Sequence, residues 1–258
     1  MRTIATFALG LLAGVTVTAR AQEAESPRTG ISILPAEIAS HAFAEGVPDL
    51  QFELAWEWQA LVCHKKCELK SVKLLMTPAL VQPYDGEVMP GHVYTIDRKL
   101  DAQPLVLMRE LPDGVRTRPE TYLHAGMEKY PPSSTPGTME IDIPVPGEPA
   151  RIVPRYARQS DNSDLFNVYL ETKGRSQLLA RIHVDVVAGP SGMARGPQLL
   201  RWAGDLDGDG KLDLIMNLSS RYGEDAAATL FLSSAAKPGE MVGMAAGFRY
   251  WPVGNPGC

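Results

Sequence analysis

Four aspartates share one short segment late in the chain, at its first, third, fifth and ninth positions: Asp205, Asp207, Asp209 and Asp213. We expect a tightly curled loop to turn these carboxylates toward one centre, with the backbone carbonyl of Lys211 as a further oxygen ligand. Gly208 and Gly210 would permit the sharp reversal that closes such a loop. An anionic site made only of oxygen atoms suits Ca²⁺, because Mg²⁺ prefers a stricter octahedron and transition metals prefer histidine or cysteine.

The negative charge of this segment favours a bound cation. Without an ion, each pair of carboxylates held a few ångströms apart repels by about 1–4 kcal/mol at intermediate to high dielectric. A dication at the centre removes most of that repulsion. We therefore predict that residues 205–213 bind a structural Ca²⁺ ion. The alternative is a solvated acidic turn that binds nothing.

The residues around the loop differ from those of an EF-hand. The twelfth position is Met216, where an EF-hand has a bidentate glutamate, and Leu214–Leu218 is a strand-like run and not an amphipathic helix. Leu199–Trp202, before the loop, also has strand character. The pattern predicts a strand-loop-strand unit that the ion holds closed.

The run Gly-Asp-Leu-Asp-Gly-Asp-Gly-Lys-Leu-Asp-Leu resembles the FG-GAP and VCBS repeat loops of integrin-type propellers and of many exported bacterial proteins. By that resemblance the calcium ligands are Asp205, Asp207, Asp209, the carbonyl of Lys211, and Asp213. A whole propeller is not implied, because seven blades need at least about 280 residues. The chain has 258 residues and a single acidic loop. We expect one such hairpin within another β architecture.

Turn signals recur along the chain between short β-branched or aromatic stretches, for example at Pro112-Asp113-Gly114 and Pro146-Gly147. Spacing of this kind is typical of all-β proteins. We therefore expect a mainly β fold, with one or two small antiparallel β-sandwich or sheet domains that carry the calcium hairpin.

The expected organisation has four parts: a signal peptide at 1–21, an N-terminal segment at 22–47, a β domain at 48–132, and a β domain at 133–258 that carries the loop 205–213. The N-terminal segment contains one credible short helix. Pro35 suits a first helical position, Ile38 and Ala42 share one side, and Gly46 is the stop. The boundary between the two β domains is expected within residues 130–137, where Pro, Ser, Thr and Gly are concentrated.

Three cysteines follow the expected signal peptide: Cys63, Cys67 and Cys258. Alternating residues on both sides of the first two predict a β-hairpin whose turn, 64–66, sets the two sulfur atoms opposite each other, within disulfide reach. Two alternatives remain open. His64 could join both thiolates in a metal or redox site, or Cys258 could pair with one of them.

Residues 1–21 have the pattern of a secretory signal, with Arg2, a short apolar run, and small residues at Ala19 and Ala21. The apolar run is shorter than the about 20 residues that cross a bilayer. We expect a periplasmic or secreted protein with no stable membrane insertion after cleavage. Cleavage would remove two arginines and no acid, which makes the formal charge of −5 more negative. This acidic balance argues against nucleic-acid binding.

A search for catalytic groups finds no familiar constellation, and we assign no catalytic or organic-cofactor residue. Glu140 and Asp142 share a strand face and could act as a glycosidase pair, but no other residue supports that role. Trp56 and Trp58 could form a sugar-stacking platform, although the same spacing builds an ordinary core face. We expect a calcium-stabilised protein with a binding or interaction role toward a protein or a glycan. The alternative is a calcium-stabilised hydrolase of cell-envelope polymer.

Overall fold

The structure is a computed structural model, and it describes the following residues: 30–36, 38, 42–44, 57–81, 88–124, 140–158, 164–184, 199–218 and 226–250. These residues form fifteen strands in three antiparallel sheets. The mainly β fold predicted from the turn spacing is confirmed. Among the described residues, no helix has the length and hydrophobicity needed to cross a bilayer. The signal-peptide prediction, the domain-boundary region at 130–137 and Cys258 lie outside these residues.

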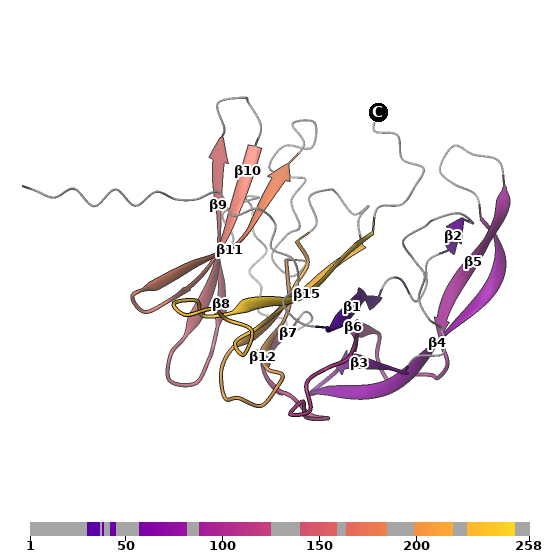
Figure 1. Cartoon of the computed structure of the whole chain (residues 1–258), viewed down its shortest axis with the longest axis horizontal. Helices are drawn as coiled ribbons and strands as arrows, with labels where there is room; N and C mark the ends of the chain where they lie inside the picture. Colours follow the sequence, from indigo (N-terminus) through magenta and orange to yellow (C-terminus); the bar gives the residue numbers. More distant parts are fainter. Residues whose placement is uncertain are drawn as a thin grey trace, which may run out of the picture.

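The first sheet has six strands. Their order in space is β1 (Ser32–Pro35), β6 (Pro104–Arg109), β3 (Glu57–Cys63), β4 (Cys67–Val81), β5 (Met89–Ile96) and β2 (Ala42–Ala44). The predicted hairpin is confirmed, because β3 and β4 pair with Cys63 opposite Cys67. The long strand β4 continues past the core to pair with β5, and the two extend away from the other sheets in Figure 1.

The other two sheets come mostly from the second half of the chain. The four-stranded sheet has the order β11 (Arg175–Val184), β10 (Asp164–Thr172), β9 (Ala150–Arg158) and β8 (Ile141–Ile143). The five-stranded sheet has the order β15 (Gly243–Tyr250), β14 (Ala226–Leu232), β13 (Asp213–Met216), β12 (Leu200–Asp205) and β7 (Glu120–His124).

The five-stranded sheet is the middle layer of the molecule (Figure 1). On one face, its residues Leu214 and Phe231 pack with Phe166 of the four-stranded sheet. On the other face, Trp202 packs with Leu61 of the six-stranded sheet. A sheet covered on both faces requires near-continuous apolar strands. This explains why every residue from 227 to 232 is buried.

The two outer sheets show the alternation of half-buried strands. In β10, Phe166 and Val168 are buried, while the alternate residues Asn167 and Tyr169 are partly exposed. A third apolar cluster lies on the outer face of the six-stranded sheet and includes Trp58, which is 2% exposed. Trp58 is therefore a core residue, as expected, while Trp56 lies outside the described residues.

The short helix predicted from Pro35 to Gly46 is wrong. Pro35 ends strand β1, opposite Val106, and Ala42 begins strand β2, opposite Val93. Between these strands, Ala36 and Ile38 have 3₁₀ geometry. Local propensity for a short helix is weak, and pairing with the edges of an existing sheet overrides it.

The predicted division at residues 132 and 133 remains a prediction. Strand β7 precedes that point in the chain, and it pairs with β12, which follows it. The middle sheet therefore takes strands from both sides of the predicted boundary. The core between the middle and six-stranded sheets does the same, since Leu61 and Ile215 belong to one cluster.

Strand β12 contains a glycine, Gly204, at a position where no residue with a side chain fits. An ideal Cβ at Gly204 would lie 2.0 Å from the carbonyl oxygen of Glu120 and 2.5 Å from the Cζ2 atom of Trp202. Both neighbours are fixed, because Glu120 belongs to the paired strand β7 and the Trp202 ring is fully buried. This close approach sets the backbone directly before Asp205.

We predict that Gly204→Ala lowers the free energy of unfolding by at least about 1–3 kcal/mol, the usual cost of overpacking a core. Urea unfolding of the purified protein measures this change. Gly247→Ala is the matched control, since the nearest atom to its Cβ would be the flexible Met244 sulfur at 4.0 Å. The control should change stability by less than about 0.5 kcal/mol. Equal effects of the two substitutions would contradict the steric argument.

Candidate metal centre

The acidic segment is the connection between β12 and β13 in the middle sheet. Gly204 and Asp213 pair across the two strands, so the loop starts and ends at adjacent points of the sheet. The predicted strand-loop-strand unit is confirmed. Both flanking strands are buried, which gives the loop a rigid base at the end of the middle layer.

Three of the predicted ligands converge. Asp205, Asp207 and Asp209 each offer a carboxylate oxygen, and these three atoms lie within 4.8 Å of one another. Their exposure increases along the loop, from buried Asp205 through Asp207 to exposed Asp209. The arrangement is a small group of oxygen atoms that opens to solvent on one side.

Asp205 organises the backbone of the loop. Its Oδ1 accepts a hydrogen bond from the Gly208 N–H at 2.7 Å, and its Oδ2 accepts one from the Gly210 N–H at 3.0 Å. Gly208 and Gly210 have φ values of 81° and 80°. Residues with a side chain rarely adopt this conformation, so the role predicted for the two glycines is confirmed.

Two serines from the turn after β14 contact the loop. The Ser233 hydroxyl donates to Oδ2 of Asp209 at 2.7 Å, and the Ser234 hydroxyl donates to Oδ2 of Asp207 at 2.5 Å. Local sequence did not predict a role for either serine, because more than twenty residues separate each from its partner. Only the pairing of β13 with β14 brings them together.

Asp213 has a different environment from the other three aspartates. It is fully buried, and its two oxygens accept hydrogen bonds from the N–H groups of Leu206 and Ser233, each at 2.8 Å. Burial raises the pKa of Asp213 to about 7; the two N–H groups oppose the shift, and the charges of Asp207 and Asp209 add to it. Asp213 therefore links the loop to the turn after β14, and its role as a metal ligand remains a prediction.

Lys211 points its charge toward the loop. Its ammonium nitrogen lies 3.4 Å from Oδ2 of Asp209. The backbone N–H of Lys211 donates to Oδ1 of Asp209 at 2.8 Å. The Lys211 side chain is 70% exposed, so the ion pair is screened by water and adds little stability. Coordination through the Lys211 carbonyl remains a prediction.

The segment from Pro112 to Arg118 packs against the loop from outside. An ideal Cβ at Gly208 would lie 3.0 Å from Nε of Arg116, and one at Gly114 would lie 3.1 Å from the carbonyl oxygen of Asp207. Arg116 thus places a positive charge beside the acidic loop. The negative charge of the loop also affects Tyr122 in β7. Burial is the main cause that raises the pKa of Tyr122, and the carboxylates of Glu120 and the loop raise it further.

The chemistry of this donor set is that of a hard-cation site. Every candidate ligand is an oxygen atom, the loop is anionic, and its outer part is open to water. Such a site can hold a cation with flexible coordination.

The glycosidase pair considered from the sequence is a surface ion cluster. Arg151 donates to Asp142 and to Glu140, each at 2.6 Å, and both acids are largely exposed. Hydrogen bonding to these two carboxylates raises the pKa of Arg151 further above its ordinary value. The arrangement explains the two acids as cross-strand partners of one arginine.

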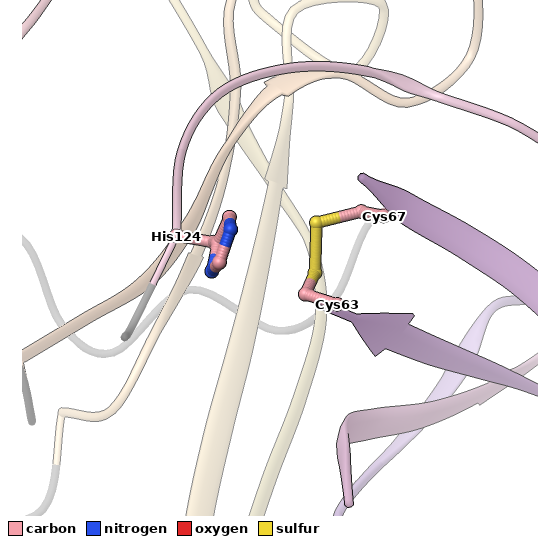
Figure 2. Close-up of side chains that lie close together, drawn as sticks. All are labelled: Cys63, Cys67 and His124. Atoms are coloured by element: carbon pink, nitrogen blue, oxygen red, sulfur yellow. A yellow bond between two sulfur atoms is a disulfide. The ribbon is translucent and has the colours of Figure 1, made fainter. Parts of the chain in front are cut away.

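The cysteine hairpin closes as predicted, since Cys63 and Cys67 form a disulfide with their Cα atoms 4.0 Å apart. The histidine beside it is not His64, which is exposed in the turn. It is His124, whose ring nitrogen lies within 4.8 Å of both sulfur atoms. Figure 2 shows the imidazole facing the disulfide from β7. The sequence contained no signal for this proximity.

Searches of protein-family models, of curated proteins and of solved structures gave no match to this chain.

We predict a pH dependence of stability that originates at Asp213, measured in a chelating buffer. The folded protein binds a proton at this carboxyl with a pKa of about 7, against an ordinary value of 3.8. Stability from this group is therefore fully present below about pH 4 and is lost as the pH rises to about 7, by up to about 1.4 kcal/mol per pH unit.

Urea unfolding across this pH range tests the prediction. Asp213→Asn should flatten the profile relative to wild type, although it lowers stability overall because its amide cannot accept both N–H bonds. Asp113→Asn, at an exposed turn position, should leave the profile unchanged. Parallel wild-type and Asp213→Asn profiles would show that Asp213 is not the titrating group.

Proposed function

We propose that residues 205–213 bind one Ca²⁺ ion that stabilises the fold. The observation that carries this proposal is the convergence of oxygen atoms from Asp205, Asp207 and Asp209 within 4.8 Å of one another. A cation among three carboxylates this close would remove most of their mutual repulsion. Their spacing along the chain also resembles that of the FG-GAP and VCBS loops. By that resemblance, the Lys211 carbonyl and Asp213 would be further ligands.

Calcium suits this donor set better than other common cations. The oxygen donors of the loop and its exposed outer carboxylate would allow the six to eight oxygen ligands that Ca²⁺ takes, with water completing the shell. Transition metals are disfavoured because the loop contains neither histidine nor cysteine. Mg²⁺ would require a more rigid octahedron.

The ion would act as a clamp between strands. Asp207 and Asp209 are already linked to Ser234 and Ser233, and Asp213 is linked to the Ser233 N–H. A cation held by the loop would therefore fix the β12–β13 connection against the turn after β14. The expected consequence is a gain in stability rather than a chemical reaction.

For the whole protein we propose an exported protein with an interaction role, in a calcium-rich compartment. Large apolar side chains are exposed on the extended strands β4 and β5 and beside them, including Leu75, Leu80, Val88 and Met89. Leu80 is 78% exposed. Large exposed apolar side chains are common at interaction surfaces, and their presence on these strands supports an interaction role over the hydrolase alternative.

We predict that Ca²⁺ raises the melting temperature and that a chelator lowers it. At a free Ca²⁺ concentration 100 times the Kd, binding only to the folded state adds about 2.7 kcal/mol. For a chain of this size the gain corresponds to roughly 5–10 °C in Tm. If the Kd is about 10⁻⁴–10⁻³ M, as in extracellular modules, this concentration is about 10–100 mM Ca²⁺.

The double variant Asp207→Ala/Asp209→Ala should lose the response to Ca²⁺, and differential scanning calorimetry measures it. The control Asp142→Ala/Glu148→Ala removes the same charge from exposed positions outside the loop and should keep the response. The comparison uses the Ca²⁺-dependent shift, because the loop variant also loses hydrogen bonds to two serines. An unchanged wild-type Tm with Ca²⁺ and with chelator would refute the proposal.

A further inference from the structure

A second group of potential metal ligands lies between two sheets. Its donor atoms are sulfur and nitrogen, whereas those of the acidic loop are oxygen. Its members are Cys63 and Cys67 at the ends of β3 and β4, and His124 at the end of β7 (Figure 2). One ligand atom from each residue lies within 4.8 Å of the other two. In the oxidised protein the two sulfurs are joined in a disulfide and are not thiolate ligands.

We propose that reduction of the Cys63–Cys67 disulfide creates a binding site for a thiophilic divalent cation such as Zn²⁺. The ligands are the two thiolates and the His124 imidazole. This proposal does not depend on calcium binding, because it uses different residues and a different class of donor atom.

The donor set matches the chemistry of zinc. Two thiolates and one imidazole supply three of the four ligands in a tetrahedral Zn²⁺ site, and water or a solute can supply the fourth. Hard cations such as Ca²⁺ and Mg²⁺ do not favour sulfur and nitrogen donors. The chain would then hold a hard-cation site that is always available and a soft-cation site that exists only after reduction.

The redox step balances with an external reductant. A trialkylphosphine attacks one sulfur and breaks the S–S bond, and water then converts the phosphorus to its oxide while the protein gains two thiols. Zn²⁺ displaces one proton from each thiol, so the bound complex forms with release of two protons.

The surrounding structure can accept this change with small movements. In a tetrahedral site with Zn–S bonds of about 2.3 Å, the two sulfurs must separate to about 3.8 Å. The hairpin pairing next to the cysteines, Val62 with Glu68, holds the backbone while the side chains rotate. His124 is held by the pairing of β7 with β12, opposite Trp202.

Burial favours a defined site over adventitious surface binding. Cys67 is 2% exposed and His124 is 8% exposed, while Cys63 is partly exposed. Both cysteines pack with the core between the middle and six-stranded sheets. The ion would therefore enter from the hairpin tip and be held between two sheets, with limited access for competing water.

Titration with Co²⁺ as a spectroscopic substitute for Zn²⁺ tests the proposal on the full chain. Protein reduced with a phosphine should bind one ion per chain and show a thiolate-to-cobalt charge-transfer band with the visible bands of tetrahedral Co²⁺. Added Zn²⁺ should remove these bands. The oxidised protein, which keeps the acidic loop, should show neither. Absence of the thiolate band in the reduced protein would overturn the proposal.

The two histidines near the hairpin provide matched variants. His124→Ala should weaken binding by more than about 10-fold, since loss of an outer hydrogen bond to a metal ligand already costs 10–100-fold. His64→Ala, in the exposed turn, should leave affinity unchanged. Wild-type affinity in His124→Ala, or a loss confined to His64→Ala, would overturn the assignment.

A measurement on wild type covers the case in which His124→Ala does not fold. X-ray absorption at the zinc edge of the reduced, zinc-loaded protein should show two sulfur ligands and the scattering pattern of one imidazole. A spectrum with sulfur and oxygen ligands but no imidazole would overturn the assignment of His124.

Discussion

The arrangement of the acidic loop depends on the hydrogen bonds that the buried carboxylate of Asp213 accepts. Its two oxygens accept the N–H groups of Leu206, at the start of the loop, and of Ser233, in the turn after β14. Burying a carboxylate is costly, and hydrogen bonds to both oxygens offset part of that cost. Because Asp213 holds these two segments together, the Ser233 hydroxyl can also reach Asp209 at the exposed end of the loop.

The middle sheet determines where both groups of candidate ligands lie. Apolar contacts cover both of its faces, so β12, β13 and β7 have little freedom to shift. The acidic loop joins two of these strands, and His124 ends the third. The six-stranded sheet packs on the same layer and brings the Cys63–Cys67 hairpin to His124. Close packing between layers therefore positions residues that are distant in the chain.

The two groups differ in the physical basis of their selectivity. The acidic loop offers only oxygen atoms, is partly open to water, and takes its backbone shape from Asp205 and two glycines at positive φ. The sulfur and imidazole group is more buried and depends on the redox state of the cysteines. Each group suits cations that the other disfavours, which would keep the two proposed sites independent.

Local spacing was enough to predict the β class, the strand-loop-strand unit and the cysteine hairpin, because these depend on residues close together in the chain. The approach of Asp205, Asp207 and Asp209 follows from alternate positions on a tight loop for the same reason. Only the tertiary structure decided the contacts of Ser233 and His124, which require sheet pairing and layer packing between distant segments. Tertiary pairing also replaced the expected helix near Pro35 with strands, because sheet hydrogen bonds and burial outweigh the weak helical preference of a short segment.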